Sequence, residues 1–170
     1  MNKIGIYLEV PEDNYNLNIE SILELFLKIE DYNWRITEND VLAKINDDWE
    51  TYSFLSEEEF GNGSNLKKEL QEIDYYPIFL NLEAYQPEIT ILEIKNTPIY
   101  NIPEFLNSKC SLKIVIIDCY EIAIFVKNIK DFPNIQQEIL SQGYENFRFI
   151  DKSANWRFSG LTYVDIMVTL

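Results

Sequence analysis

The stretch LKIVIIDCYEIAIFVK (residues 112–127) decides the fold. It holds two apolar runs of strand length, Leu112–Ile117 and Glu121–Lys127, joined by the short segment Asp118–Tyr120. A strand with one face in water alternates apolar and polar residues, whereas these two runs are apolar on both faces. We therefore expect a hairpin at the centre of a sheet that is covered on both sides.

Weaker strand patterns surround this hairpin. Ile4–Val10 and Pro77–Ala84 alternate along the chain, as a half-buried strand does. Trp34–Ile36 and Val41–Ile45 are expected to form a hairpin around the polar residues 38–40. Further short strands are expected at Thr51–Leu55, Ile89–Lys95, Phe147–Ile150 and Leu161–Val168.

Helical patterns separate some of these strands. Helices are expected from the cap Asn18 to Ile29, over Asn65–Ile73, as a short turn at Asn101–Asn107, and from the cap Asp131 to Leu140. Ser56 and Glu59 have the spacing of a capping box and predict one more turn, ending at Gly61. We expect an α+β fold with a single mixed, largely antiparallel sheet and three to four helices. A chain of 170 residues fits a single globular domain, residues 1–170.

The charge of the chain is concentrated in its N-terminal half. Residues 1–88 carry 20 acidic and 6 basic side chains, whereas residues 89–170 carry 9 and 8, so that nearly all of the net charge of −15 lies in the first half. Small soluble domains usually carry about 2–8 net charges. Such acidity repels nucleic acid and anionic membranes and attracts basic proteins.

Several classes of chemistry lack the residues that they need. There is no histidine, which excludes Ser-His-Asp and Cys-His catalysis and histidine-bound zinc. Cys110 and Cys119 are spaced neither as a zinc site nor as a redox motif, and the five glycines form no phosphate-binding loop. Three arginines are too few for a nucleic-acid groove. We therefore assign no catalytic, cofactor or metal-binding residue and expect both thiols to be reduced and dispensable.

The densest acidic stretch, Glu38–Glu59, also contains aromatic residues. Aromatic side chains anchor protein interfaces and carboxylates steer a basic partner towards them. The candidate partner-binding residues are Asp47, Asp48, Trp49, Glu50, Glu57 and Glu58. A structural interpretation stays open, in which Glu57–Glu59 complement a helix N-terminus and the other carboxylates lie on a solvated loop.

No stretch approaches the roughly 20 apolar residues of a membrane span, and the N-terminus does not have the pattern of a signal peptide. We expect a cytoplasmic protein that binds neither membrane nor nucleic acid.

Four segments give the chain a family resemblance. They are GIYLEVP (5–11), YNWRI (32–36), FLNSKCSLKIVIIDC (105–119) and EILSQGYENFRFI (138–150). The order of these segments resembles an uncharacterised family, a domain of unknown function, of small proteins from Bacillus-type Gram-positive bacteria. The resemblance implies a cytoplasmic bacterial protein and assigns no site residues.

Three functional hypotheses follow. The first is a non-enzymatic acidic protein-binding module that neutralises a basic partner, as bacterial immunity proteins or phage inhibitors do. The second is a structural or assembly protein, including a homodimer built on an exposed sheet edge. The third is a small-ligand binder or an enzyme that uses carboxylates, which a pocket with convergent polar groups would favour.

Overall fold

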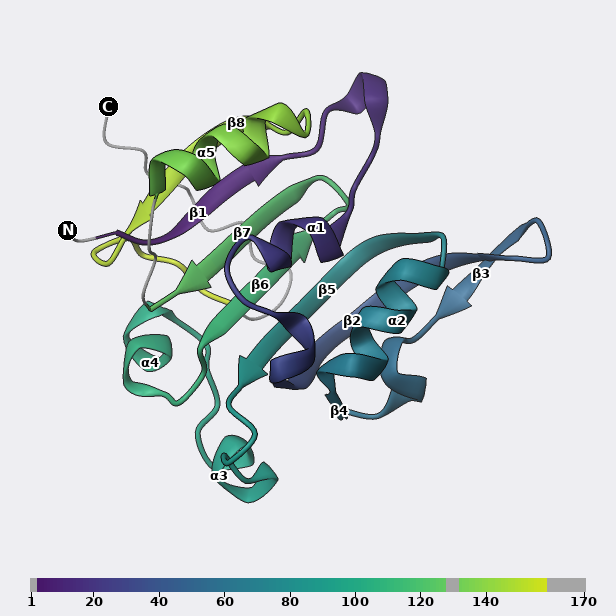
Figure 1. The fold of residues 1–170 in the computed structure, drawn as a ribbon. Coiled ribbons are helices and arrows are strands. Elements are labelled where there is room, and N and C mark those ends of the chain that lie inside the picture. Colours follow the sequence, from purple (N-terminus) through teal and green to yellow (C-terminus); the bar gives the residue numbers. More distant parts are fainter. Residues whose placement is uncertain (1–2, 128–131, 159–170) are drawn as a thin grey trace.

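One antiparallel sheet organises the part of the chain that the computed structural model describes, residues 3–127 and 132–158 (Figure 1). Its strands are β1 (Lys3–Glu9), β2 (Asn33–Ile45), β3 (Asp48–Tyr52), β4 (Phe60–Asn62), β5 (Tyr75–Tyr85), β6 (Leu112–Ile117), β7 (Glu121–Val126) and β8 (Glu145–Asp151). They follow the order β3-β2-β5-β6-β7-β1-β8, and β4 also pairs with β2. The expected α+β class with one sheet is confirmed. We expected a mixed, largely antiparallel sheet, and every described strand pairing is antiparallel.

The predicted central hairpin is confirmed. β6 and β7 pair from Leu112 opposite Val126 to Ile117 opposite Glu121. Three strands of the order given above, β5, β2 and β3, lie beyond β6, and two, β1 and β8, lie beyond β7. The chain reverses at Asp118 and Cys119, whose φ angles are 52° and 61°. A short aspartate side chain tolerates this left-handed backbone, which matches the twist of the two strands.

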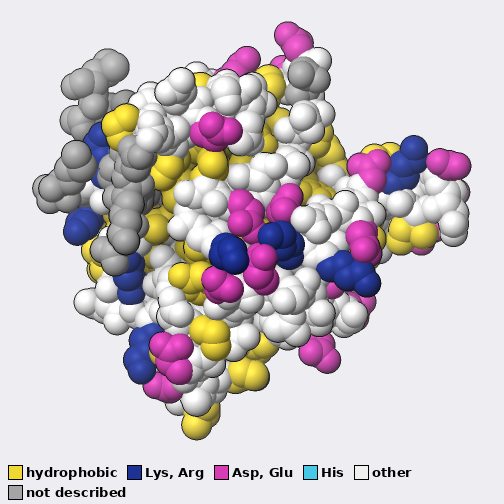
Figure 2. Space-filling model, viewed as in Figure 1, with side chains coloured by type: hydrophobic (Ala, Val, Ile, Leu, Met, Phe, Trp, Pro, Cys, Tyr) yellow, Lys and Arg dark blue, Asp and Glu magenta, His cyan; other side chains and the backbone are white. Residues whose placement is uncertain are grey.

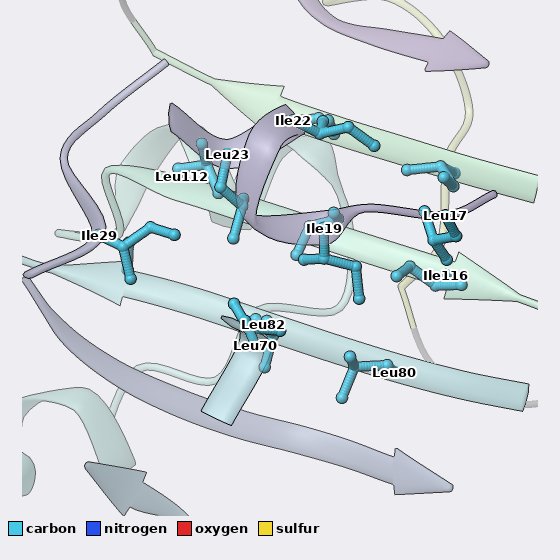
Figure 3. Close-up of a cluster of buried hydrophobic side chains, with 14 of the residues drawn as sticks. Leu17, Ile19, Ile22, Leu23, Ile29, Leu70, Leu80, Leu82, Leu112 and Ile116 are labelled. Carbon is cyan, nitrogen blue, oxygen red and sulfur yellow. The ribbon is translucent and has the colours of Figure 1, made fainter. Parts of the chain in front are cut away.

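Three helices cover one face of the sheet, here called face 1. They are α1 (Ile19–Glu24), α2 (Gly63–Glu72) and α5 (Phe132–Ser141), and they lie in front of the strands in Figure 1. Ile22 of α1 and Leu70 of α2 pack in one apolar cluster with Leu82 of β5 (Figure 3). Each such side chain contributes about 1.5–3 kcal/mol through burial, so face 1 is the main core.

Two shorter helices lie against the opposite face, face 2. They are α3 (Ile91–Lys95) and α4 (Ile102–Asn107). Ile94 and Phe105 join a second, smaller apolar cluster with Tyr85 and Phe125 of the sheet. Because this cluster covers face 2 less completely, polar side chains of the strands have room there.

The structure corrects the prediction for residues 89–95, where we expected a strand. Ile91–Lys95 is the helix α3, and its N-cap is a full capping box. The Thr90 hydroxyl accepts from the Glu93 N–H at 3.3 Å, and the Glu93 carboxylate accepts from the Thr90 N–H at 3.0 Å. With α3, the described residues contain five α-helices.

The region of residues 33–61 also differs from the prediction. The expected hairpin around residues 38–40 is instead one continuous strand, β2, whose pairing with β5 slips by one residue between Ile36 and Glu38. The turn expected from Ser56 is no α-helix, because Leu55, Ser56 and Glu57 all have positive φ. The expected strand Leu161–Val168 and the expected cap Asp131 lie outside the described residues.

Candidate functional site

Four of the six predicted partner-binding residues lie on one projecting hairpin. β5 begins at Tyr75, opposite Ala43 of β2, so residues 44–49 extend past the end of β5. The turn is formed by Asn46 and Asp47, with φ of 51° and 70°, a geometry that Asn and Asp adopt readily in two-residue hairpins. We call residues 44–50 the arm; it stands away from the body of the protein in Figures 1 and 2.

The arm combines exposed carboxylates with an exposed aromatic ring. The side chains of Asp47, Asp48 and Glu50 are exposed, and only Asp47 has a cation nearby, the Lys44 ammonium at 3.6 Å. The Trp49 side chain is 51% exposed. An apolar side chain of this size is usually buried, so the exposure of Trp49 near the end of a hairpin is the unusual feature of the arm.

The Trp49 ring packs against Tyr76, which in turn packs against Tyr15. Its ring lies edge-on to Tyr76 with 6.4 Å between ring centroids, and Tyr76 lies 4.7 Å from the ring of Tyr15. Tyr15 is itself 38% exposed. These ring contacts reduce the side-chain freedom that Trp49 would lose on binding a partner.

The other two predicted residues, Glu57 and Glu58, are exposed but lie at the opposite end of β3. Glu59, the residue after them, accepts from the Ile36 N–H, whereas Trp49 lies opposite Lys44, so about eight residues of β2, or about 25 Å, separate them from Trp49. The turn Phe54–Glu57 before them is held by Glu69, whose carboxylate accepts from the Leu55 N–H at 3.0 Å and from the Tyr52 hydroxyl at 2.8 Å. The structure thus brings four of the predicted residues together and leaves two at the base of the arm.

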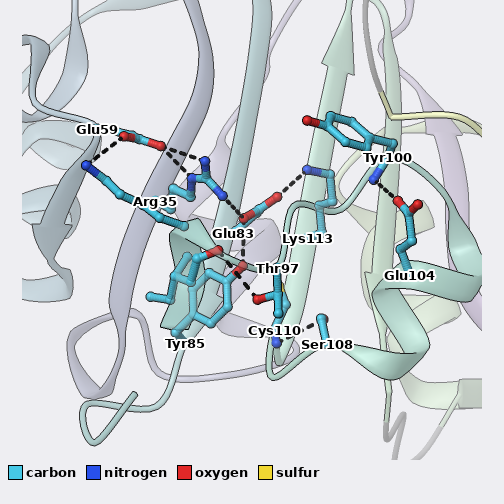
Figure 4. Close-up of polar contacts among 12 residues, drawn as sticks. Arg35, Glu59, Glu83, Tyr85, Thr97, Tyr100, Glu104, Ser108, Cys110 and Lys113 are labelled. Carbon is cyan, nitrogen blue, oxygen red and sulfur yellow. Dashed lines mark hydrogen bonds and ion pairs between the residues drawn. The ribbon is translucent and has the colours of Figure 1, made fainter. Parts of the chain in front are cut away.

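A second polar centre lies on face 2, and the sequence analysis did not find it. Glu83 of β5 and Lys113 of β6 face each other across the strands with 2.7 Å between carboxylate and ammonium, and each side chain is 1% exposed (Figure 4). The Tyr85 hydroxyl donates to the other Glu83 oxygen at 2.7 Å. Two buried charges are tolerated because each compensates the other and further hydrogen bonds complete the pair.

The buried pair continues into a row of alternating charges. The Arg35 guanidinium lies 3.9 Å from Glu83 and donates to Glu59 at 2.7 Å, and the Lys95 ammonium lies 3.8 Å from Glu59. This row connects β2, β5 and β6 with α3 and leads from the buried pair to the surface. A sequence signal for it existed, since Lys113 interrupts an apolar run and Glu83 alternates with leucines.

A polar cavity of about 400 Å³ opens beside this row. Glu38 and Asn81 form part of its wall, together with Arg35, Glu83 and Lys113. Tyr100, from the connection between α3 and α4, lines it from the other side. Its volume lies within the range of about 300–1,000 Å³ that is usual for small-molecule sites.

A third polar cluster surrounds Glu9 at the end of β1. Its carboxylate accepts from the hydroxyls of Tyr7 and Tyr120, both at 2.7 Å, and from the side-chain amide of Asn146. Burial alone would raise the pKa of Glu9, but these hydrogen bonds, with the Arg148 guanidinium at 3.9 Å, lower it overall. Both oxygens of the Glu9 carboxylate accept hydrogen bonds. The cluster therefore has a structural role, in which it connects β1 with the β6–β7 turn and with β8.

The two cysteines are free thiols, and both are buried. Burial raises the pKa of each thiol above its usual value, and Cys110 donates to the Leu112 carbonyl at 3.0 Å. Protonated buried thiols are poor nucleophiles. Within residues 3–127 and 132–158 no group of three or more cysteine or carboxylate side chains is placed to hold a metal ion. No helix in the same ranges is long and apolar enough to cross a membrane.

Comparison with known proteins identifies relatives without a known activity. Residues 3–159 match the family described as "Protein of unknown function (DUF2691)". The uncharacterised protein YncE of Bacillus subtilis (strain 168) is 24% identical over 159 residues, which cover 94% of this chain and 98% of YncE. No solved structure matches the chain significantly. The family match covers nearly the whole sequence, and the chain therefore belongs to the DUF2691 family of proteins of unknown function.

Proposed function

We propose that this protein is a non-enzymatic binding module that docks a basic protein partner through its arm, with Asp47, Asp48, Trp49 and Glu50 in the contact. The observation that carries the proposal is the half-exposed Trp49 on a hairpin that projects beyond the sheet, between exposed carboxylates. Interfaces take most of their energy from a few such aromatic anchors. The surrounding carboxylates steer the encounter and select a partner of opposite charge.

The free edge of β3 favours a basic partner over a second copy of this chain. Among the described strands β3 pairs only with β2, so the backbone groups on its outer side can accept a further strand. Antiparallel pairing of two copies along this edge would bring Asp48 and Glu50 of one close to the carboxylates of the other, which is unfavourable. A strand with lysine or arginine side chains meets no such repulsion.

Glu57 and Glu58 have a supporting role in this proposal. They lie too far from Trp49 to share one small contact, but their charges add to the field around the arm. We expect them to affect the rate of association more than the lifetime of the complex, as charges at the rim of an interface do.

The test is capture of partners from the native host with three forms of the protein. The first is wild type, and the second carries Asp47→Lys, Asp48→Lys and Glu50→Lys. The third is a control of equal net charge, with Glu88→Lys, Glu138→Lys and Glu145→Lys at exposed positions away from the arm. We expect a basic partner that wild type and the control retain at low salt and that the arm variant loses.

Binding kinetics with the captured partner complete the test. The arm variant is expected to slow association about tenfold at low salt, and the difference should shrink at high salt because exposed charges are screened beyond about 8–10 Å. Trp49→Ala should instead speed dissociation. An acidic partner, or binding that is indifferent to both the arm charges and salt, would contradict the proposal and favour an assembly role.

A further inference from the structure

The cavity on face 2 has a buried acceptor that no described residue satisfies. Asn81 is 3% exposed, and its side-chain N–H₂ donates to the Glu38 carboxylate at 3.0 Å and to the Phe158 carbonyl at 3.3 Å. These two acceptors fix which end of the amide is nitrogen. The amide oxygen, Asn81 Oδ1, is buried and receives no hydrogen bond from the described residues. An orphaned buried acceptor of this kind is costly, so it indicates a group that the site is built to receive.

Glu38 reaches this cavity because of a bulge in β2. Arg35 lies opposite Glu83, and Glu38 lies opposite Asn81. From the first pair to the second, β5 advances by two residues and β2 by three, so β2 contains one extra residue, Thr37. Without the extra residue, strict alternation would turn Glu38 towards face 1. Bulges re-aim side chains in this way next to functional sites.

Glu38 is the carboxylate of the cavity that lacks a cation. Of the three acidic residues that line the cavity, Glu83 contacts Lys113 and Glu59 contacts Arg35. Glu38 forms no ion pair within residues 3–127 and 132–158, and Asn81 is its hydrogen-bond donor there. Lys95 contacts Glu59 from outside the cavity wall, so the three carboxylates are matched by three cationic side chains, but in the part of the chain that the structure describes none of these forms an ion pair with Glu38.

Glu38 and Asn81 together form a fork of acceptors. The Asn81 amide nitrogen donates to one Glu38 oxygen, and both residues line the cavity, so the charged carboxylate and the unpaired amide oxygen belong to the same wall. A group with two or more N–H donors and a positive charge complements such a fork. A hard metal ion does not, because it requires about six oxygen ligands.

We propose that this cavity binds a small organic cation, a guanidinium or primary ammonium group, through Glu38 and the Asn81 side-chain oxygen. Tyr100, which lines the cavity and is 53% exposed, provides an aromatic surface, whereas the buried Phe158 ring already has the Lys113 ammonium 5.2 Å from its centroid. Aromatic faces attract organic cations. The cation comes either from a free amine or from an arginine or lysine side chain of a protein, and the site is separate from the arm.

The proposal is tested by calorimetric titration of the whole chain with three probes. Agmatine supplies a free cation with a guanidinium at one end and a primary ammonium at the other. N-acetyl-arginine amide supplies the guanidinium as it occurs in a protein, and N-acetyl-citrulline amide is its uncharged match. We expect binding of the guanidinium probes and at least about tenfold weaker binding of the citrulline probe. Binding of agmatine alone identifies a free amine as the source, and binding of both guanidinium probes identifies a side chain.

Variants locate the binding. Glu38→Gln retains an acceptor for the Asn81 amide but removes the negative charge. It should lower the affinity for agmatine at least about tenfold. Glu88→Gln, which removes an exposed carboxylate elsewhere, should leave the affinity for agmatine unchanged. Asn81→Ser, checked for folding by thermal melting, provides a second disruption of the fork. Equal binding of the charged and uncharged probes, or full binding by Glu38→Gln, overturns the proposal.

The two proposals fail independently. Trp49→Ala should leave the binding of agmatine unchanged, because the arm contributes no residue to the cavity wall. Conversely, loss of agmatine binding in Glu38→Gln predicts nothing for capture of a partner by the arm.

Discussion

The two faces of the sheet are made from the same strands and yet are built differently. In β5, Leu80 and Leu82 enter the apolar cluster of face 1, while Asn81 and Glu83 point to face 2. In β6, Ile114 faces one side and Lys113 the other. Face 1 is stabilised by the removal of apolar surface from water, whereas face 2 depends on matched polar partners. One sheet thus combines a large apolar core on face 1 with a smaller apolar cluster and a buried ion pair on face 2.

Removing one partner of the buried pair should have the largest effect. Lys113→Ala leaves the Glu83 carboxylate buried without its cation, which we expect to lower the free energy of unfolding by about 3–5 kcal/mol. The measurement is urea unfolding monitored by fluorescence. The matched control on face 1 is Ile114→Val, which should cost about 0.5–1.5 kcal/mol.

The double variant Lys113→Met, Glu83→Leu sharpens the same comparison. Replacing both partners removes the unpaired charge, so most of the lost stability should return. If Lys113→Ala costs no more than the exposed substitution Lys95→Ala, face 2 does not depend on charge matching, and the contrast between the faces is wrong.

A smaller effect is expected at Glu9, and it should depend on pH. Its pKa is lowered in the folded protein, so its contribution to stability is present above the unfolded pKa of about 4.3 and is lost as the pH falls through the lower, folded value. Glu9→Gln should therefore cost about 1–2 kcal/mol at pH 7 and progressively less below pH of about 4. Urea unfolding of both forms between pH 7 and pH 3 checks this. A difference that stays constant over that range would show that charge at Glu9 is irrelevant.

The smallest effect on stability is expected in the arm. Trp49 is half-exposed and lies beyond the end of β5, so Trp49→Ala should change the free energy of unfolding by less than about 1 kcal/mol. Thermal melting of both Trp49→Ala and Ile124→Ala checks this. Ile124 is fully buried, and its replacement by alanine should cost about 2–5 kcal/mol, which provides the reference for a large effect. A loss comparable to that of Ile124→Ala would make Trp49 a structural residue and remove the main support for the arm as a contact surface.

The apolar runs predicted the centre of the fold correctly because burial on both faces leaves a direct signal in the sequence. The helix α3 was missed for the opposite reason. Ile89, Ile91 and Ile94 suggest a short strand, and the five-residue helix is determined by the capping box at Thr90 and by one buried contact through Ile94. Short elements carry too few residues for periodicity to separate strand from helix.

The candidate sites show the same limit. Local composition singled out Asp47, Asp48, Trp49 and Glu50 because they are adjacent in the sequence, but it did not predict the projecting hairpin that carries them. The cavity was not predicted, because Glu38, Asn81 and Lys113 meet only through strand pairing and through a bulge that no local pattern announces. The polar residues 38–40 predict a turn, yet they lie within β2. Three consecutive polar residues occur both in turns and in a strand that contains a bulge, so the sequence pattern does not separate the two.

The position of β1 has a consequence for how the chain is made. This N-terminal strand lies between β7 and β8, with Gly5 opposite both Phe125 and Ile150 (Figure 1). At synthesis rates of about 5–20 residues per second, its two neighbours leave the ribosome of order ten seconds after it does. During that interval an apolar strand with two unpaired edges waits for partners, which is the situation in which chains aggregate or recruit chaperones. β1 is thus made well before either of the two strands that pair with it.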